Sequence, residues 1–209
     1  MPIIKTTIND RPVEMSVKSF YRHDKLIAAI DPDTEKSGLA IVDDGILKAL
    51  DALEFYNLVD LLAGLPEVLV VLEDIDNSKP TYPRCTSQSV KNAISRKVGR
   101  AQHAAKMIRK AMDRANIEYV LVAPLSLPEK RRAKDDGKFF NDLTGWVGRT
   151  NEDKRDAAML GLYGLPPGYS VCDQQHAFAG AVCPSCRYEK MVKEARAARA
   201  RRAKITTKP

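Results

Sequence analysis

The sequence lacks a long run of apolar residues. Hydrophobic residues make up 44% of the 209 positions, yet no apolar stretch approaches the ~20 residues that a membrane span requires. The first residues, MPIIKTTINDRPVEM, contain no apolar core of an export signal and include the acidic Asp10 and Glu14. We therefore expect a protein that spans no membrane and that stays in the cytoplasm of a bacterial-type cell.

Most of the chain also lacks an excess of charge. The formal net charge is +7, and the segment from residue 187 onward accounts for all of it, because it holds nine basic residues and two acidic ones. Such a basic block suits a polyanion such as nucleic acid, since each neutralised phosphate releases counterions. The alternative is a solvated, partly helical tail that only aids solubility.

Apolar runs separated by turn signals predict an α/β domain with a mixed five-stranded sheet flanked by helices. We expect strands at 26–31, 39–45, 46–55, 67–74 and 117–124, and helices at 57–65, 90–115, 138–146 and 150–162. Residues 76–89 and the charged segment 125–138 are predicted as loops. An edge hairpin turning near Asn9 and Asp10 is a further possibility.

We divide the chain into three parts. Residues 1–25 form an N-terminal extension, residues 26–168 form the main domain, and residues 169–209 form a Cys/His segment followed by the basic tail.

Acidic residues stand at the points where two predicted strands end. Asp31 closes LIAAID, and Glu73 closes the strongest strand, EVLVVLED. Ligands of open α/β sheets bind at strand ends. Each acid also has a simpler interpretation, because Asp31 before Pro32 can start a turn and Glu73 can lie at a solvated strand exit.

Two more acids open the helix predicted in TNEDKRDAAMLGL. Asp153 and Asp156 are three residues apart, so both carboxylates project from one face. A helix cap and the helix dipole would explain acids in the first turn, but they explain Asp156 poorly because the apolar face has begun by then.

Together, Asp31, Glu73, Asp153 and Asp156 would require a divalent cation, since four carboxylates repel one another. Oxygen ligands favour Mg²⁺, and Mn²⁺ can substitute. Two such ions about 4 Å apart suit phosphodiester hydrolysis: one activates the water and the other stabilises the leaving oxygen.

These motifs resemble those of the RuvC-type Holliday junction resolvases, particularly the phage-type members, within the RNase H-like superfamily. The resemblance rests on IAAIDPDTEKSGLAIVDDG, VLVVLED, KVGRAQHAAKMI and NEDKRDAAMLGL, and it covers about residues 26–165. The sequence departs from the family pattern in its turn, which has Pro32 and Asp33 where many relatives have glycine. Asp74 beside Glu73 adds a second acid at that strand end, and strand alternation points only one of the two inward.

The resemblance implies an RNase H-like fold and a metal-dependent, structure-selective endonuclease that resolves branched DNA during recombination and repair. It implies that Asp31, Glu73, Asp153 and Asp156 are the catalytic, metal-binding acids, and that the protein acts as a homodimer with the long helix at the interface. Lys130, Arg131, Arg132 and Lys134 could contact phosphates near the site; otherwise they form a solvated charge run.

The four cysteines, in a chain predicted to stay in the cytoplasm, argue against disulfides. Cys183-x2-Cys186 has the spacing of a zinc half-site, which Cys172 and His176 could complete as a structural Zn²⁺ site. Unliganded thiols are the alternative, and Cys85 stands alone.

Three rival functions remain to be weighed. RNase H activity on RNA:DNA hybrids shares the fold and the metal chemistry. A catalytically silent DNA-binding module would predict a missing acid, whereas all four are present. An actin-like ATPase needs two lobes and a second phosphate loop, and the sequence provides neither.

Overall fold

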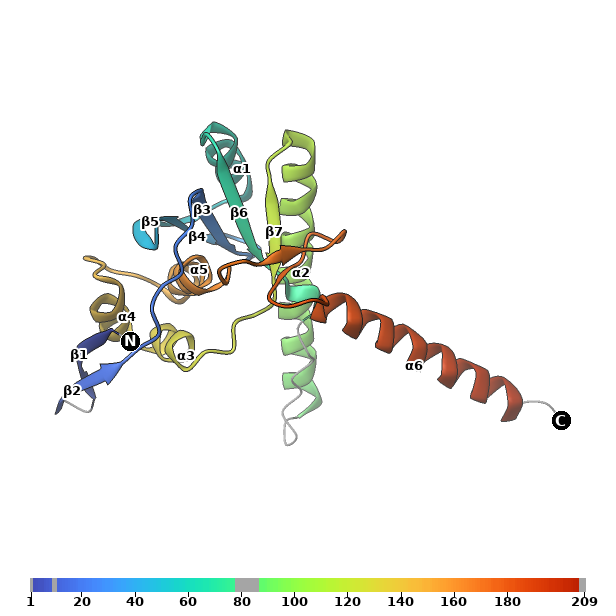
Figure 1. The fold of residues 1–209 in the computed structure, drawn as a ribbon. Coiled ribbons are helices and arrows are strands. Elements are labelled where there is room, and N and C mark those ends of the chain that lie inside the picture. Colours follow the sequence, from blue (N-terminus) through green and yellow to red (C-terminus); the bar gives the residue numbers. More distant parts are fainter. Residues whose placement is uncertain (1, 9–10, 78–86, 207–209) are drawn as a thin grey trace.

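The computed structural model describes residues 2–8, 11–77 and 87–206. Its centre is one five-stranded sheet with the strand order β5-β4-β3-β6-β7 (Figure 1). These strands are β3 (Leu26–Asp31), β4 (Ser37–Asp43), β5 (Ile46–Leu53), β6 (Val68–Glu73) and β7 (Tyr119–Val122). Among the described residues, no helix combines the length and the apolar character that crossing a bilayer demands.

The sheet is mixed. Strands β3, β4 and β5 form an antiparallel meander, whereas β3 pairs with β6, and β6 with β7, in parallel. The three central strands are almost fully buried, as apolar runs between two helical layers must be. The predicted α/β class with a mixed five-stranded sheet is confirmed.

Alternation along the strands creates two cores, one on each face of the sheet. Helices α1 (Phe55–Gly64) and α2 (Gln88–Ala115) cover one face, where they bury Leu58, Ile108 and Met112 against β3 and β6. Helix α5 (Glu152–Tyr163) covers the other face together with α3 (Pro128–Asp135) and α4 (Gly137–Thr144) (Figure 1).

The helix predicted at 90–115 is confirmed as α2. The Ser87 side chain caps its start by accepting a hydrogen bond from the backbone N–H of Val90, and Asn116 ends it in the left-handed conformation. Only the second half of α2 packs on the sheet, because Val98 is 40% exposed while Ala105 is buried. Of the predicted loop at 76–89, residues 78–86 lie outside the described part, and Ile75–Asn77 form a short 3₁₀ turn, η1.

Two expectations about connecting segments were wrong. The segment predicted as a loop at 125–138 contains α3, which has Pro128 at its first position, Glu129 in its first turn and Lys134 in its last. These residues favour a helix through the pre-set proline φ and the helix dipole. Since Ala133 is its one buried residue, α3 has no apolar stripe that periodicity could reveal.

The second correction concerns the N-terminal hairpin. Strands β1 (Ile3–Ile8) and β2 (Arg11–Ser16) pair antiparallel, but they form a separate two-stranded sheet that contacts α4 and do not extend the main sheet. The predicted turn at Asn9 and Asp10 lies outside the described residues. Tyr163 of α5 donates a hydrogen bond from its hydroxyl to the Lys18 carbonyl, 2.9 Å away, which ties the segment after β2 to α5.

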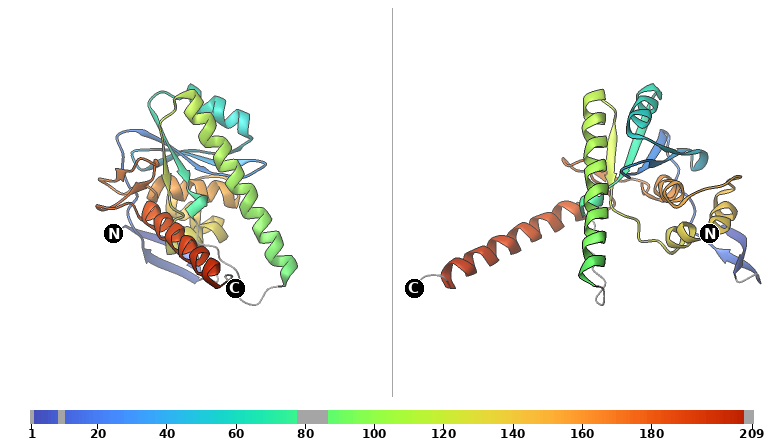
Figure 2. Two further views of the ribbon diagram at one scale, coloured as in Figure 1. Left: turned by 90° about the vertical axis from the view of Figure 1, so that its right-hand side faces the viewer. Right: turned by 180° about the vertical axis from the view of Figure 1, so that it is seen from behind.

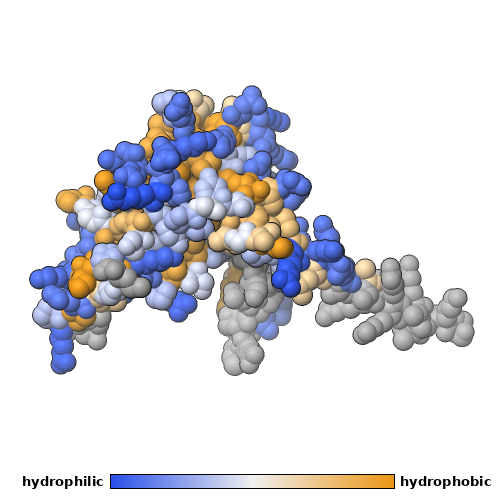
Figure 3. Space-filling model, in the orientation of Figure 1, coloured by the Kyte–Doolittle hydropathy of each residue, from blue (hydrophilic) through white to orange (hydrophobic). Residues whose placement is uncertain are grey.

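After α5, the chain crosses to the far edge of the sheet. It forms a small hairpin from β8 (Ser170–Val171) and β9 (Ala177–Phe178) beside β7, and then helix α6 (Pro184–Thr206). Figure 1 and the right-hand view of Figure 2 show α6 projecting away from the sheet and its helices. Figure 3 shows an orange area where this hairpin lies, and Val171 and Val182 are among the exposed apolar residues of the segment.

Candidate active site and cysteine cluster

Two acids occupy neighbouring positions on the central strands. The parallel register pairs Ile30 of β3 with Leu72 of β6, so Asp31 and Glu73 follow side by side. Alternation places both on the face covered by α5, because Ala29 and Val71, two residues earlier, belong to that core. The sheet therefore brings together two acids that are 42 positions apart in the sequence.

Helix α5 brings the other two acids to this strand end. Asn151 caps the helix by accepting a hydrogen bond from the Lys154 backbone N–H at 3.0 Å, so Asp153 and Asp156 fall in and just after the first turn. Gly38, the cross-strand partner of Asp31, makes this possible: a Cβ there would stand 2.2 Å from the backbone oxygen of Asp153. A side chain at position 38 would clash with the start of α5 and prevent the helix from packing here.

We call Asp31, Glu73, Asp153 and Asp156 the acid cluster. Two lysines of α3 accompany it: Lys130 Nζ donates to Glu73 Oε1 at 2.7 Å, and Lys134 Nζ donates to Asp156 Oδ2 at 2.6 Å. The Lys130–Glu73 pair is largely buried, with side chains 12% and 14% exposed. The two ammonium groups therefore neutralise part of the negative charge of the acid cluster.

Electrostatics show how closely the acids interact. Burial raises the pKa of Asp31 well above its usual value, and the charges of Glu73 and Asp156 raise it further, against the opposing effect of the two lysines. Burial alone would lower the pKa of Lys134, but its hydrogen bond to Asp156 and the surrounding acids raise it. Three of the acids thus share one electrostatic environment.

Asp153 stands slightly apart from the other three. Burial raises the pKa of its carboxyl, and the charge of Asp33 adds the next largest increase, ahead of the contribution from Asp156. Asp33 lies in the β3–β4 turn, where its carboxylate accepts a hydrogen bond from the Glu35 backbone N–H. Sequence reasoning noted Asp33 only as a departure from a glycine, and its place beside Asp153 depends on the fold.

The residues present fit a divalent cation. Asp156 Oδ1 is fully buried and has no hydrogen-bond partner among the described residues. The pKa of Asp31 is raised first by burial and then by the charges of Glu73 and Asp156, which Lys130 and Lys134 offset only in part. The four acids do not form one tight ligand set here, since Lys130 and Lys134 bind two of them. A cation would therefore compete with the ammonium groups for the same oxygens.

The four basic residues named from the sequence lie in different settings. Lys130, Arg131 and Lys134 line a cavity of about 350 Å³ together with Asp156. Arg132 instead faces inward, where its guanidinium lies 4.4 Å from the centre of the Phe139 ring and donates a hydrogen bond to Met15 Sδ. The sequence did not reveal that two of these lysines would bind the acid cluster.

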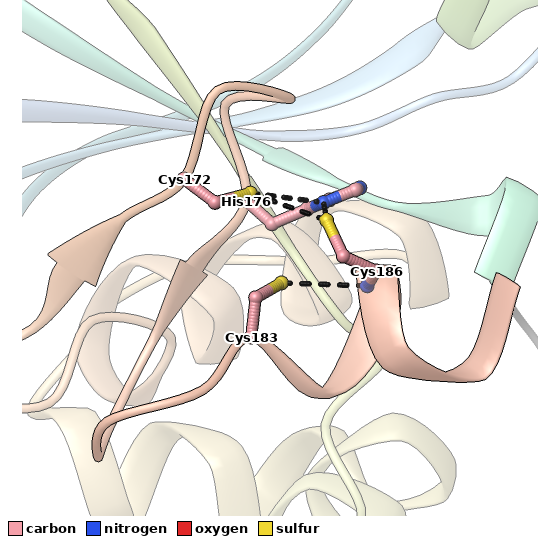
Figure 4. A group of neighbouring side chains, drawn as sticks. All are labelled: Cys172, His176, Cys183 and Cys186. Atoms are coloured by element: carbon pink, nitrogen blue, oxygen red, sulfur yellow. Dashed lines mark hydrogen bonds between the residues drawn. The ribbon is translucent and has the colours of Figure 1, made fainter. Parts of the chain in front are cut away.

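A second group of side chains lies beyond the end of β6. Cys172, His176, Cys183 and Cys186, which we call the cysteine cluster, place their ligand atoms within 4.8 Å of one another (Figure 4). Within the described part of the chain, this is the one group of three or more Cys, His, Asp or Glu residues gathered so closely. The Cys/His grouping predicted from spacing is therefore present.

Asp74 separates the two sites. It follows Glu73 directly, is 3% exposed, and faces His176, whose Nε2 lies 3.2 Å from Asp74 Oδ2. Glu73 therefore belongs to the acid cluster and Asp74 to the cysteine cluster. No signal in the linear sequence joins Asp74 to His176, which lies 102 positions later.

Comparison with known proteins gave matches among solved structures. No family model and no curated protein matches the chain. The chain is similar to T. thermophilus RuvC in complex with a Holliday junction substrate, at 16% identity over 66% of this chain and 90% of that one, with a TM-score of 0.45. It is also similar to a further Thermus thermophilus RuvC structure, at 14% identity over 65% and 90% of the two chains, with a TM-score of 0.41.

Proposed function

We propose that this protein is a Mg²⁺-dependent endonuclease that cleaves branched DNA. The observation that carries the proposal is the acid cluster: Asp31 and Glu73 on adjacent strands, with Asp156 held over them by α5 and its Oδ1 buried without a partner among the described residues. Carboxylate oxygens are the ligands that Mg²⁺ prefers, and clusters of them serve phosphodiester hydrolysis in nucleases.

Asp31, Glu73 and Asp156 would hold the cation. Asp153, which lies near Asp33, would be the fourth ligand. Bound Mg²⁺ supplies an activated water and charge stabilisation at the leaving oxygen. Lys130 and Lys134 hold the carboxylates in place through hydrogen bonds. Once released from them, the two ammonium groups can bind the phosphates of the substrate, since they line the adjacent cavity with Arg131.

The substrate class follows from charge and from the motifs. The basic tail suits nucleic acid, and the resemblance of the motifs to RuvC-type resolvases implies a four-way DNA junction cut by a homodimer. RNase H activity on RNA:DNA hybrids is the second candidate, because an acid cluster of this kind can support hydrolysis of either a DNA or an RNA phosphodiester backbone.

A cleavage assay with three substrates tests the proposal. A four-way DNA junction, a linear duplex and an RNA:DNA hybrid are incubated with Mg²⁺, Mn²⁺ or EDTA, and wild type is compared with Asp156→Asn. We expect metal-dependent paired nicks in the junction, and a loss of about 100-fold or more in Asp156→Asn, the cost of removing one electrostatic contact to a transition state.

Asp43→Asn is the matched control, because Asp43 is an exposed acid of β4 that pairs with Lys48 on the surface. It should cut the junction at the wild-type rate. Cleavage of the hybrid alone would favour RNase H activity. Junction binding without cleavage under any metal would make the protein a DNA-binding module.

A further inference from the structure

We propose that the cysteine cluster binds a structural Zn²⁺ and that Asp74 positions His176 as one of the four ligands. This site is separate from the acid cluster, and its test does not depend on nuclease activity.

The spacing of the donor atoms fits a tetrahedral zinc site. His176 Nδ1 lies 3.5 Å from the sulfur of Cys172 and 3.5 Å from that of Cys186, and the two sulfurs are 3.5 Å apart. Zn–S bonds of about 2.3 Å and Zn–N bonds of about 2.0 Å at tetrahedral angles place sulfur and nitrogen about 3.5 Å apart and two sulfurs about 3.8 Å apart. The three distances among Cys172, His176 and Cys186 are close to these values, and the sulfur of Cys183 lies within 4.8 Å of the other three donor atoms.

The chemistry of the donors selects the metal. Three thiolates and one imidazole are soft or borderline ligands, which favour Zn²⁺ over Mg²⁺ or Ca²⁺. Four protein ligands leave no position open for water, and such closed sites are structural. The Cys186 backbone N–H also points at Cys183 Sγ, 3.5 Å away (Figure 4), an arrangement that stabilises a thiolate at the start of α6.

Asp74 supplies the outer contact that zinc-binding histidines usually have. His176 Nδ1 faces the sulfurs and Nε2 faces Asp74 Oδ2 at 3.2 Å. A neutral ring that carries its proton on Nε2 would donate a hydrogen bond to the carboxylate and direct the Nδ1 lone pair at the metal. A buried carboxylate in this position fixes both the tautomer and the orientation of the ring.

The proposed zinc joins two segments that contribute little to the apolar cores. Cys172 and His176 flank a tight turn, which is attached to β7 through the Leu121 backbone N–H donating to the Gln175 carbonyl at 2.7 Å. Cys183 and Cys186 lie at the start of α6, which contacts η1 after β6. Zinc binding would therefore hold the first turn of the basic helix against the sheet, and its binding free energy would stabilise this segment.

Metal content of the full chain, purified without a histidine tag and in the presence of Zn²⁺, is the first measurement. We expect about one zinc per chain, with X-ray absorption showing three sulfur ligands and one nitrogen ligand. Cys183→Ser and Cys186→Ser should lose the metal, whereas Cys85→Ser, which changes a cysteine that the proposed site does not use, should keep it. Titrating wild type with an organomercurial, which displaces metal from thiolates, should release one equivalent of zinc per chain. This measurement tests the site even if the cysteine variants fail to fold.

A second comparison tests Asp74. Asp74→Ala should weaken zinc affinity by about 10–100-fold in competition with a chelator, and Asp74→Asn, which retains an acceptor oxygen, should lose less. Asp76→Asn is the control, because Asp76 pairs with Lys106 and Arg109 on the surface instead. Folded wild type without zinc, or a disulfide between Cys172 and Cys186, would overturn the zinc site. A zinc affinity of Asp74→Ala equal to that of wild type would overturn the role of Asp74.

Discussion

The fold disfavours the charged form of Asp31. Its carboxyl is held between Glu73 and Asp156 with limited access to water, so its pKa is raised well above the ordinary value. A group whose pKa is higher in the folded state than in the unfolded state destabilises the fold once it is ionised. This destabilising effect is present at neutral pH and disappears as the pH falls through the raised pKa toward the ordinary Asp range.

We therefore predict that Asp31→Asn abolishes metal-dependent cleavage and yet raises the Tm in EDTA at neutral pH. A gain of 1 kcal/mol corresponds to about 2–4 °C for a chain of this size. The difference between variant and wild type should shrink as the pH is lowered toward about 4, because the ordinary Asp pKa is about 3.9 and the unfolded state then begins to take up the proton as well. Thermal unfolding between pH 4 and 8 measures both effects.

Mg²⁺ should reverse the order of stability, because it binds the folded wild type and not the variant. Asp43→Asn, an exposed acid, should change stability by no more than about 0.5 kcal/mol in either condition. A lower Tm for Asp31→Asn in EDTA would contradict the electrostatic account.

At the scale of elements, the contact between α5 and β4 decides where Asp153 and Asp156 lie. Gly38 and Gly161 both permit it: a Cβ at Gly38 would stand 2.2 Å from the Asp153 backbone oxygen, and one at Gly161 would stand 2.9 Å from Val42. The sequence predicted β4 and α5 correctly. No sequence pattern indicated that Gly38 would contact Asp153 or that Gly161 would contact Val42.

Gly38→Ala should lower the free energy of unfolding by about 1–3 kcal/mol, the cost of overpacking a tight contact. Cleavage should fall by about 100-fold, since a shift of about 1 Å in catalytic groups has that effect. Urea denaturation and junction cleavage measure the two losses.

Gly99→Ala is the matched control, because a Cβ at Gly99 in α2 meets nothing within 4 Å. It should stabilise the chain by roughly 0.5–1 kcal/mol through helix propensity. If the two variants behaved alike, close packing at Gly38 would not position α5.

At the scale of the whole molecule, charge is divided between a neutral main part and a basic end. The net charge of +7 resides in the segment from residue 187 onward, nearly all of which belongs to α6. Replacing Arg196, Arg199, Arg201 and Arg202 by Gln should weaken binding similarly for junction and duplex. The slope of log affinity against log salt should become shallower by about 0.9 for each phosphate that the variant no longer neutralises.

Equilibrium binding over a range of salt concentrations measures that slope. The same four positions changed to Lys should retain it, because counterion release depends on charge. An unchanged slope in the Gln variant would show that the segment only aids solubility.

The linear sequence determined the local features of this protein. The apolar runs specified the five strands, and a capped start of the α5 helix followed from residue type. Cys172, His176, Cys183 and Cys186 could be grouped by spacing alone. These properties depend on neighbours within a few positions along the chain, so a single sequence contains them. The helix α3 was missed because its eight residues bury only Ala133 and show no period.

Tertiary structure alone decided which distant residues meet. Strand register placed Asp31 beside Glu73, packing at Gly38 brought α5 over them, and α3 directed Lys130 and Lys134 onto the acids. The opposite directions of Glu73 and Asp74 assigned one acid to each site. Such contacts depend on how the layers pack, and the packing of layers depends on the whole chain at once.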